Sequence, residues 1–196
     1  LSHHQLTLEP NTLFAAKPPA GIPEMDDAWD IQERCIELME ETGYAQYEVS
    51  AYAKAGKRCQ HNLNYWQYGD YLGIGAGAHG KISSGESGQI LRRWKPKNPR
   101  DYMQSAGSLA GIGGDEFVTE QNRPFDYMLN ALRLVEGFSL KDFEYRTGLS
   151  REAIAAELHK AYAEQWLGQD GDWVKPTELG MRFANDVMGL FLSDKK

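Results

Sequence analysis

The order of apolar and polar residues predicts strands in the N-terminal part of the chain and mainly helices in the C-terminal part. Residues 1–8 and 44–53 predict strands, the second because aromatic and β-branched residues alternate with others along it. Between them, Asp26 or Asp27 caps an expected helix that ends at Gly43. Its apolar face is Trp29, Ile31, Cys35, Leu38 and Met39. Such a βαβ unit predicts two parallel, neighbouring strands in one sheet.

The middle of the chain predicts more extended backbone. Residues 70–79 form a third extended segment. Residues 81–84 and 89–94 are expected to pair as an antiparallel hairpin around the turn at 85–88.

A short helix is expected at 99–103, and a glycine cluster at 111–114 then breaks the pattern. We therefore predict two domains. The first, residues 1–112, contains the strands and the hairpin, and the second covers residues 115–196.

The second domain predicts three helices, a β-hairpin and a closing helix, an order that resembles a winged-helix domain. The signals are an apolar stripe at 125–135, serine N-caps at Ser139 and Ser150, an Asp170–Gly171 turn and a Thr177 N-cap. The third helix, 151–165, carries Glu152, Glu157 and Glu164 against Arg151 and Lys160. This balance disfavours DNA binding and favours a role in protein packing.

Net charge excludes one broad function class. The 196 residues carry a net charge of −7, so binding to nucleic acid through phosphate neutralisation is disfavoured. One basic cluster at 92–97 is either a solvated strand end or an anion contact. No apolar run is long enough for a membrane span and no signal peptide is present, which favours a cytoplasmic protein.

Cysteine content and the first residue limit the chemistry further. Cys35 and Cys59 are the only cysteines and lie far apart, so a zinc or iron–sulfur site built from this chain alone is not expected. The chain begins at Leu1, without Met, inside an apparent strand. We therefore expect it to be a fragment whose upstream half is missing, with an exposed strand edge at 1–8 that promotes self-association.

The stretch 61–80, HNLNYWQYGDYLGIGAGAHG, has the composition of a binding site. Its glycines allow the backbone to approach a flat or phosphate-bearing ligand closely. Gly75, Gly77 and Gly80 match a dinucleotide fingerprint, but the residues that follow predict a hairpin instead of the required helix. Two alternatives stay open: a buried glycine-rich strand packed against a bulky neighbour, or a ligand-facing strand of a β/α barrel-like sheet.

Four motifs in this order resemble the oxygen-independent coproporphyrinogen III oxidase-like radical SAM family, in particular its HemW branch of heme chaperones. They are LSHHQLTLEPNT at 1–12, YEVSAYA at 47–53, HNLNYW at 61–66 and DYLGIGAGAHG at 70–80. The resemblance covers nearly the whole chain. The His-Asn-x-x-Tyr-Trp string is its most specific part.

The resemblance implies an α/β fold: the C-terminal part of a partial (β/α) barrel, followed by a helical domain that covers the barrel mouth. It also implies a [4Fe–4S] cluster and S-adenosylmethionine (SAM) in the full-length protein. The family's Cys-x-x-x-Cys-x-x-Cys cluster motif does not occur in these 196 residues, so the chain by itself is expected to lack radical chemistry.

The candidate site residues follow from the same motifs. His61 is a candidate heme-iron ligand, with Asn62, Tyr65 and Trp66 beside the porphyrin, although His61 and Asn62 equally fit a turn cap and the two aromatics equally fit a core. Candidate SAM contacts are Gly75, Gly77, His79 and Thr7.

Three functions remain open: a heme chaperone, a true coproporphyrinogen oxidase, and a non-catalytic interaction module. Expected partners are heme or porphyrin and heme-acceptor proteins.

Overall fold

The structure, a computed structural model, describes residues 1–193 and divides them into two compact units, 1–59 and 60–193. The last three residues of the second predicted domain, 194–196, lie outside the described part. The units divide at Cys59 and Gln60, so the predicted boundary at 112–115 stays a prediction.

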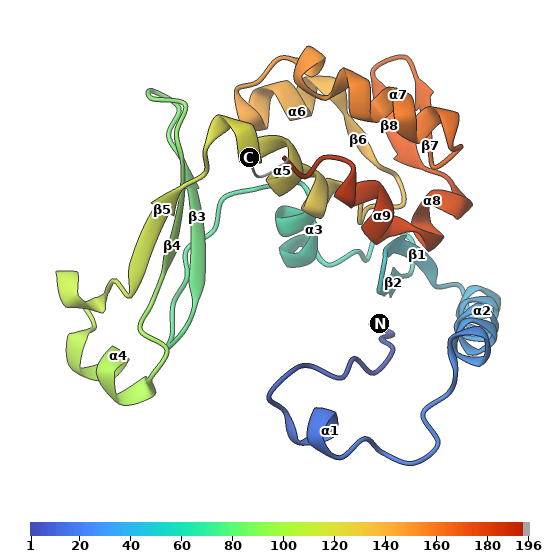
Figure 1. The fold of residues 1–196 in the computed structure, drawn as a ribbon, viewed down its shortest axis with the longest axis horizontal. Coiled ribbons are helices and arrows are strands. Elements are labelled where there is room, and N and C mark those ends of the chain that lie inside the picture. Colours follow the sequence, from blue (N-terminus) through green and yellow to red (C-terminus); the bar gives the residue numbers. More distant parts are fainter. Residues whose placement is uncertain (194–196) are drawn as a thin grey trace. The chain divides into compact units, whose positions relative to one another are not determined.

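The first unit has two helices and one small antiparallel hairpin (Figure 1). The predicted long helix is present, and Gly43 follows it in the left-handed conformation with φ 81°. The predicted cap at Asp26 or Asp27 is wrong, because both lie in the first turn and the N-cap is Glu24, without a side-chain hydrogen bond. The elements are α1 (Leu13–Ala16), α2 (Met25–Glu41), β1 (Ala45–Glu48) and β2 (Ala51–Ala53).

The predicted single strand at 44–53 is wrong, because the chain reverses at Val49 and Ser50. Ala45 pairs with Ala53 in antiparallel register, so the expected parallel βαβ pair is also wrong. Buried Glu48 accepts a hydrogen bond from Ser50 Oγ at 2.9 Å, which stabilises this reversal. The stretch 44–53 contains no Gly, Pro, Asn or Asp, so the sequence gives no strong turn signal there.

The predicted strand at 1–8 is also wrong beyond its first residues. Only Ser2 bridges Ala51, and the His3 amide donates to the Ser50 carbonyl oxygen at 2.9 Å. The segment pairs with the start of β2, and the chain turns away immediately before Ala51. No partner strand is therefore available for the residues after His3. The strand edge proposed for self-association is therefore not formed.

The second unit contains two three-stranded antiparallel sheets and the helices around its core. The sheets run β3-β4-β5 and β6-β8-β7. The elements are α3 (Gln60–Trp66), β3 (His79–Ser83), β4 (Ile90–Trp94), α4 (Pro99–Ser105), η1 (Leu109–Gly111), β5 (Gly114–Phe117), η2 (Glu120–Asn122), α5 (Arg123–Ala131), β6 (Phe138–Ser139), α6 (Leu140–Thr147), η3 (Arg151–Ile154), α7 (Ala155–Ala163), β7 (Leu167–Asp170), β8 (Trp173–Pro176), α8 (Glu178–Arg182) and α9 (Ala184–Gly189).

Most local predictions for this unit are confirmed. β3 and β4 form the expected hairpin, and β7 and β8 turn at Asp170–Gly171. The hydroxyls of Ser139, Ser150 and Thr177 accept hydrogen bonds from the first turns that they precede. The closing helix is broken at Phe183 into α8 and α9.

The core of the second unit lies among its helices. Tyr127 is fully buried, with its ring 5.4 Å from that of Phe138 and 5.2 Å from that of Phe143. These edge-to-face contacts join α5, β6 and α6. Every strand pairing in residues 1–193 is antiparallel, so the β/α barrel stays a prediction, as does the winged-helix class.

A charged cluster ties α6 to the β7–β8 turn. Arg151 donates to Glu144 Oε2 at 2.8 Å and to Asp172 Oδ1 at 3.0 Å. The hydrogen bonds from Arg151 lower the pKa of Glu144 to about 2. A carboxyl whose folded pKa is depressed adds stability above its unfolded pKa, and this stability is lost as the pH falls through the folded value.

We therefore expect Glu144→Gln to flatten the loss of stability with falling pH between about 4.5 and 2. The measurement is urea unfolding at a series of pH values. The control is Glu152→Gln, an exposed neighbour, which should keep the parent's slope. An acid slope unchanged in Glu144→Gln would contradict the role given to this carboxyl.

Candidate functional site

His61 and Tyr65 lie one turn apart on α3, a short helix where the sequence predicted only a connection. Their rings meet edge to face at 4.8 Å, with the His61 side chain exposed and Tyr65 half-buried. Residues four apart share one helix face, which explains the contact. Tyr68, with φ 58°, then turns the chain out of the helix.

Tyr65 continues a row of rings toward the hairpin. Its ring centroid lies 4.4 Å from that of Tyr71, whose backbone bridges Lys81 of β3. Trp66 faces away toward Arg133, whose guanidinium lies 4.3 Å from the indole ring. The Trp66 indole N–H is buried and has no hydrogen-bond acceptor within residues 1–193.

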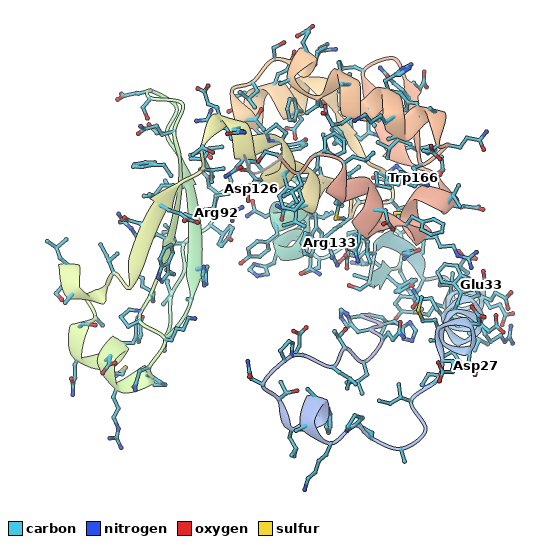
Figure 2. The ribbon with its side chains drawn as sticks, in the orientation of Figure 1. Asp27, Glu33, Arg92, Asp126, Arg133 and Trp166 are labelled. Atoms are coloured by element: carbon cyan, nitrogen blue, oxygen red, sulfur yellow. The ribbon has the colours of Figure 1, made fainter. Side chains whose placement is uncertain are left out.

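Arg92 joins this row to the helical part of the unit. It donates to the Tyr71 hydroxyl at 3.1 Å and, through Nη2, to both Asp126 oxygens at 2.9 and 2.8 Å. Figure 2 shows Arg92 on β4 and Asp126 on α5 approaching one another. The Tyr68 hydroxyl also donates to Asp126, at 2.5 Å. The pKa of Tyr68 is raised, mainly because the hydroxyl is buried and secondly because the Asp126 carboxylate lies beside it.

A buried lysine anchors the start of the same row. Lys81 is 2% exposed and donates to the Tyr68 carbonyl, Asp70 and Ser83 at 3.0, 2.8 and 3.0 Å. Burial lowers the pKa of Lys81 in spite of Asp70. Burial also acts to raise the pKa of Asp70, but hydrogen bonds from Lys81 and Ser83 outweigh it and lower that pKa. This network fixes where the chain enters β3.

The glycine-rich stretch is a loop and not the predicted strand. Gly75 and Gly77 have φ of 115° and 69°, which side chains rarely adopt. A Cβ at Gly73 would lie 2.4 Å from the His79 carbonyl oxygen, because these backbones run close together. The Gly75 amide donates to the Tyr102 hydroxyl and the Gly77 amide to the Pro96 carbonyl.

His79 begins β3 beside Trp94, its register partner on β4. Their rings are stacked, with centroids 6.1 Å apart and an interplanar angle of 29°. Both residues line a groove of about 1710 Å³ that also includes Arg92 and Asp126. His61, Tyr65 and Trp66 do not line it.

The predicted site residues therefore fall into three places. His61, Asn62, Tyr65 and Trp66 share α3, whereas Gly75, Gly77 and His79 lie along the loop that leads to the groove. Thr7 is exposed in an irregular segment of the first unit. Sequence reasoning missed Lys81, Tyr71 and Asp126.

Arg92 was noticed only as part of a basic cluster. In the structure Arg92 binds Asp126 and Arg93 binds Asp115, so carboxylates of the chain itself take up both charges. The partner of Arg92 lies 34 positions away in the sequence, and no local pattern points to it.

The two cysteines lie apart, Cys35 in α2 and Cys59 before α3. Cys35 is half-buried, Cys59 is exposed, and both are free. Across the described part of the chain, no group of three or more His, Cys, Asp or Glu side chains is arranged to hold a metal ion. Residues 1–193 also contain no helix long and apolar enough to span a bilayer.

The fold is similar to that of a solved radical SAM enzyme. The structure of coproporphyrinogen III oxidase (HemN) from Escherichia coli, described as a radical SAM enzyme, matches with a TM-score of 0.64. The match covers 91% of this chain and 44% of that one at 16% identity, and so shows the fold alone. A model of the HemN C-terminal domain matches residues 118–183.

The relatives by sequence are more specific. The chain is 43% identical to the heme chaperone HemW of Escherichia coli over 194 residues, covering 99% of this chain and 50% of that protein. It is 42% identical over 195 residues to the heme chaperone HemW of Haemophilus influenzae, with 100% and 49% covered. The chain thus contains a HemN C-terminal domain, is homologous to the C-terminal half of the HemW proteins, and spans about half the length of these relatives.

Proposed function

We propose that this chain contributes the C-terminal, porphyrin-binding part of a heme chaperone of the HemW type, acting in the cytoplasm and passing heme to acceptor proteins. The observation that carries the proposal is similarity along nearly the whole of this chain to half of a protein named a heme chaperone, at 43% identity over 99% of the chain. The geometry of α3 supports it, because an exposed imidazole lies against a tyrosine ring.

In this proposal His61 supplies the ligand to heme iron. A neutral imidazole has a lone pair suited to iron, and the exposed position of His61 leaves room for a large macrocycle. Tyr65 offers apolar ring area beside it, and Asn62 and Trp66 lie on the same helix. The contact between Tyr65 and Tyr71 keeps the Tyr65 ring in place.

The proposed SAM contacts are backbone contacts along the glycine loop, with His79 at its end. The amides of Gly75 and Gly77 already donate to the Tyr102 hydroxyl and the Pro96 carbonyl oxygen, so SAM would meet carbonyl groups or the bare Cα surface there. A [4Fe–4S] cluster does not fit this chain's own residues, because two free, separate cysteines cannot provide its thiolates. No step of the proposal therefore depends on one.

The test is a heme titration of the full-length protein. We expect His61→Ala and Tyr65→Ala each to weaken heme binding about tenfold or more, since an iron ligand or a buried ring area is lost. Lys141→Glu, an exposed change on α6, is the control. Thermal melts establish that each variant is folded. If both variants bind heme like the parent, the α3 residues are structural and the proposed site is wrong.

A second candidate is a true coproporphyrinogen III oxidase, which the fold similarity to HemN favours. The two functions are separated by assaying the anaerobically reconstituted full-length protein with coproporphyrinogen III. Turnover of this substrate would support the oxidase. Heme binding without turnover would support the chaperone. If the protein shows no turnover and no heme binding, the interaction module is the function that remains.

A further inference from the structure

The exposed His61 imidazole is restricted by its ring contact with Tyr65, one turn further along α3. The two ring centroids lie 4.8 Å apart, and the ring planes meet at 85°. An exposed side chain otherwise exchanges among staggered rotamers, and a ligand that requires one rotamer must offset the entropy of fixing it. A neighbouring ring that already favours one orientation lowers this cost. The position of the Tyr65 ring therefore affects how tightly His61 binds a ligand.

The Tyr65 ring also contacts the ring of Tyr71, a residue outside α3. Their centroids lie 4.4 Å apart, and their planes meet at 62°. The helix ends at Trp66, and Tyr71 follows the turn at Tyr68, so the contact ties α3 to the segment that leads into β3. Because α3 has seven residues and none of them is buried, contacts of this kind decide where its side chains lie.

Tyr71 is held both at its backbone and at its hydroxyl. Its amide donates to the Lys81 carbonyl oxygen at 3.0 Å, and its carbonyl oxygen accepts from the Lys81 amide at 2.9 Å. Its hydroxyl accepts a hydrogen bond from Arg92 Nη1 at 3.1 Å. Arg92 in turn donates through Nη2 to both oxygens of Asp126 on α5, at 2.9 and 2.8 Å (Figure 2). The Tyr71 ring therefore has a fixed place from which it supports Tyr65.

We propose that Tyr71 is a positioning residue for His61: it holds the Tyr65 ring, and through that ring it raises the affinity of the imidazole for heme iron. The inference rests on the proposed function, since Tyr71 has this role only where His61 binds the iron. Tyr71 acts through the other two rings and is not itself an iron ligand. The motifs at 61–66 and 70–80 then serve one site, although they lie on different elements.

The first test is a heme titration of the full-length protein and its Tyr71 variants. Tyr71→Leu removes the ring, and we expect it to weaken heme binding about fivefold, since an edge-to-face contact corresponds to about two- to tenfold in affinity. Tyr71→Phe keeps the ring and should stay closer to the parent. The matched control is Tyr145→Leu on α6, whose side chain is 82% exposed and outside the ring row. Thermal melts establish that each variant is folded.

The second test asks whether the effect passes through His61. In the His61→Ala background, Tyr71→Leu is expected to cause no further loss of heme affinity, because the group that it positions is absent. A readout without heme comes from NMR of protein labelled with ¹³C-histidine, in which the ring current of Tyr65 shifts the ring protons of His61. Tyr71→Leu should change these His61 shifts, and Tyr145→Leu should leave them as in the parent.

The outcomes separate the positioning role from the function proposed above. Tyr71→Leu with the parent's heme affinity and His61 shifts, or with the same loss of affinity whether or not His61 is present, overturns the positioning role. The chaperone function is then still supported if His61→Ala weakens heme binding. If His61→Ala binds heme like the parent, the iron ligand and the positioning role are both wrong. A loss that depends on His61, together with changed His61 shifts, supports the proposal.

Discussion

Asp126→Ala is expected to lower the free energy of unfolding by about 2–4 kcal/mol. Breaking a buried ion pair costs roughly 3–5 kcal/mol, and we reduce this because the Arg92 and Asp126 side chains are each 23% exposed. The change leaves the Arg92 charge and the Tyr68 hydroxyl without their acceptor. Arg92, which donates to the Tyr71 hydroxyl, is then no longer held in position by α5. The measurement is urea unfolding at neutral pH.

The neighbouring pair on β4 provides the matched control. Arg93 and Asp115 form the same kind of pair one residue further along, but their side chains are 36% and 44% exposed. Exposed pairs contribute roughly 0–1 kcal/mol, so Asp115→Ala should have a small effect. Equal destabilisation by the two variants would show that Asp126 has no special role in joining β4 to α5.

The second large effect is expected at Gly137, which precedes β6. Gly137 has φ 73°, and a Cβ there would lie 2.0 Å from the Val174 carbonyl oxygen of β8. Gly137→Ala therefore combines a left-handed conformation, costing roughly 1–2 kcal/mol, with overpacking that costs roughly 1–3 kcal/mol. We expect a total loss of about 2–5 kcal/mol in the free energy of unfolding.

Gly171 separates these two contributions. Its φ of 56° is also left-handed, but nothing lies within 4 Å of an added Cβ in the β7–β8 turn. Gly171→Ala should therefore cost only about 1 kcal/mol, from the backbone alone. If Gly137→Ala were no worse than Gly171→Ala in thermal and urea unfolding, the close approach of β6 to β8 would be wrong.

The sequence predicted elements whose signals are local. The glycine-bounded turn at 85–88 gave the β3–β4 hairpin, and Ser139, Ser150 and Thr177 gave three helix starts. These signals act over three or four residues and depend on the chain nearby. They therefore depend less on tertiary contacts than the other elements do.

The failures involve contacts that no local pattern encodes. The turn at Val49 and Ser50 lies in a stretch without Gly, Pro, Asn or Asp, so the sequence predicted one strand where the structure has a hairpin. Residues 70–79 had the glycines of a close-packed strand, but their left-handed positions form a loop. The sequence also did not predict the α3 helix, because its seven residues are too few for a clear helical period.

The candidate site shows the same division. The string at 61–66 marked His61 and Tyr65, and the structure places their rings in contact. The residues that support them, Arg92 and Asp126, lie on separate elements and became visible only in three dimensions. Lys81 looked like an ordinary strand residue, although its side chain is buried in a polar network.

The most direct test of the central claim, that His61 holds heme iron, is chemical rescue of His61→Gly by free imidazole. Because His61 is exposed on α3, imidazole can reach the position of the missing ring. The account predicts that the heme spectrum of the variant differs from that of the parent and returns to it when imidazole is added. A variant that shows the parent's heme spectrum without imidazole would contradict the claim.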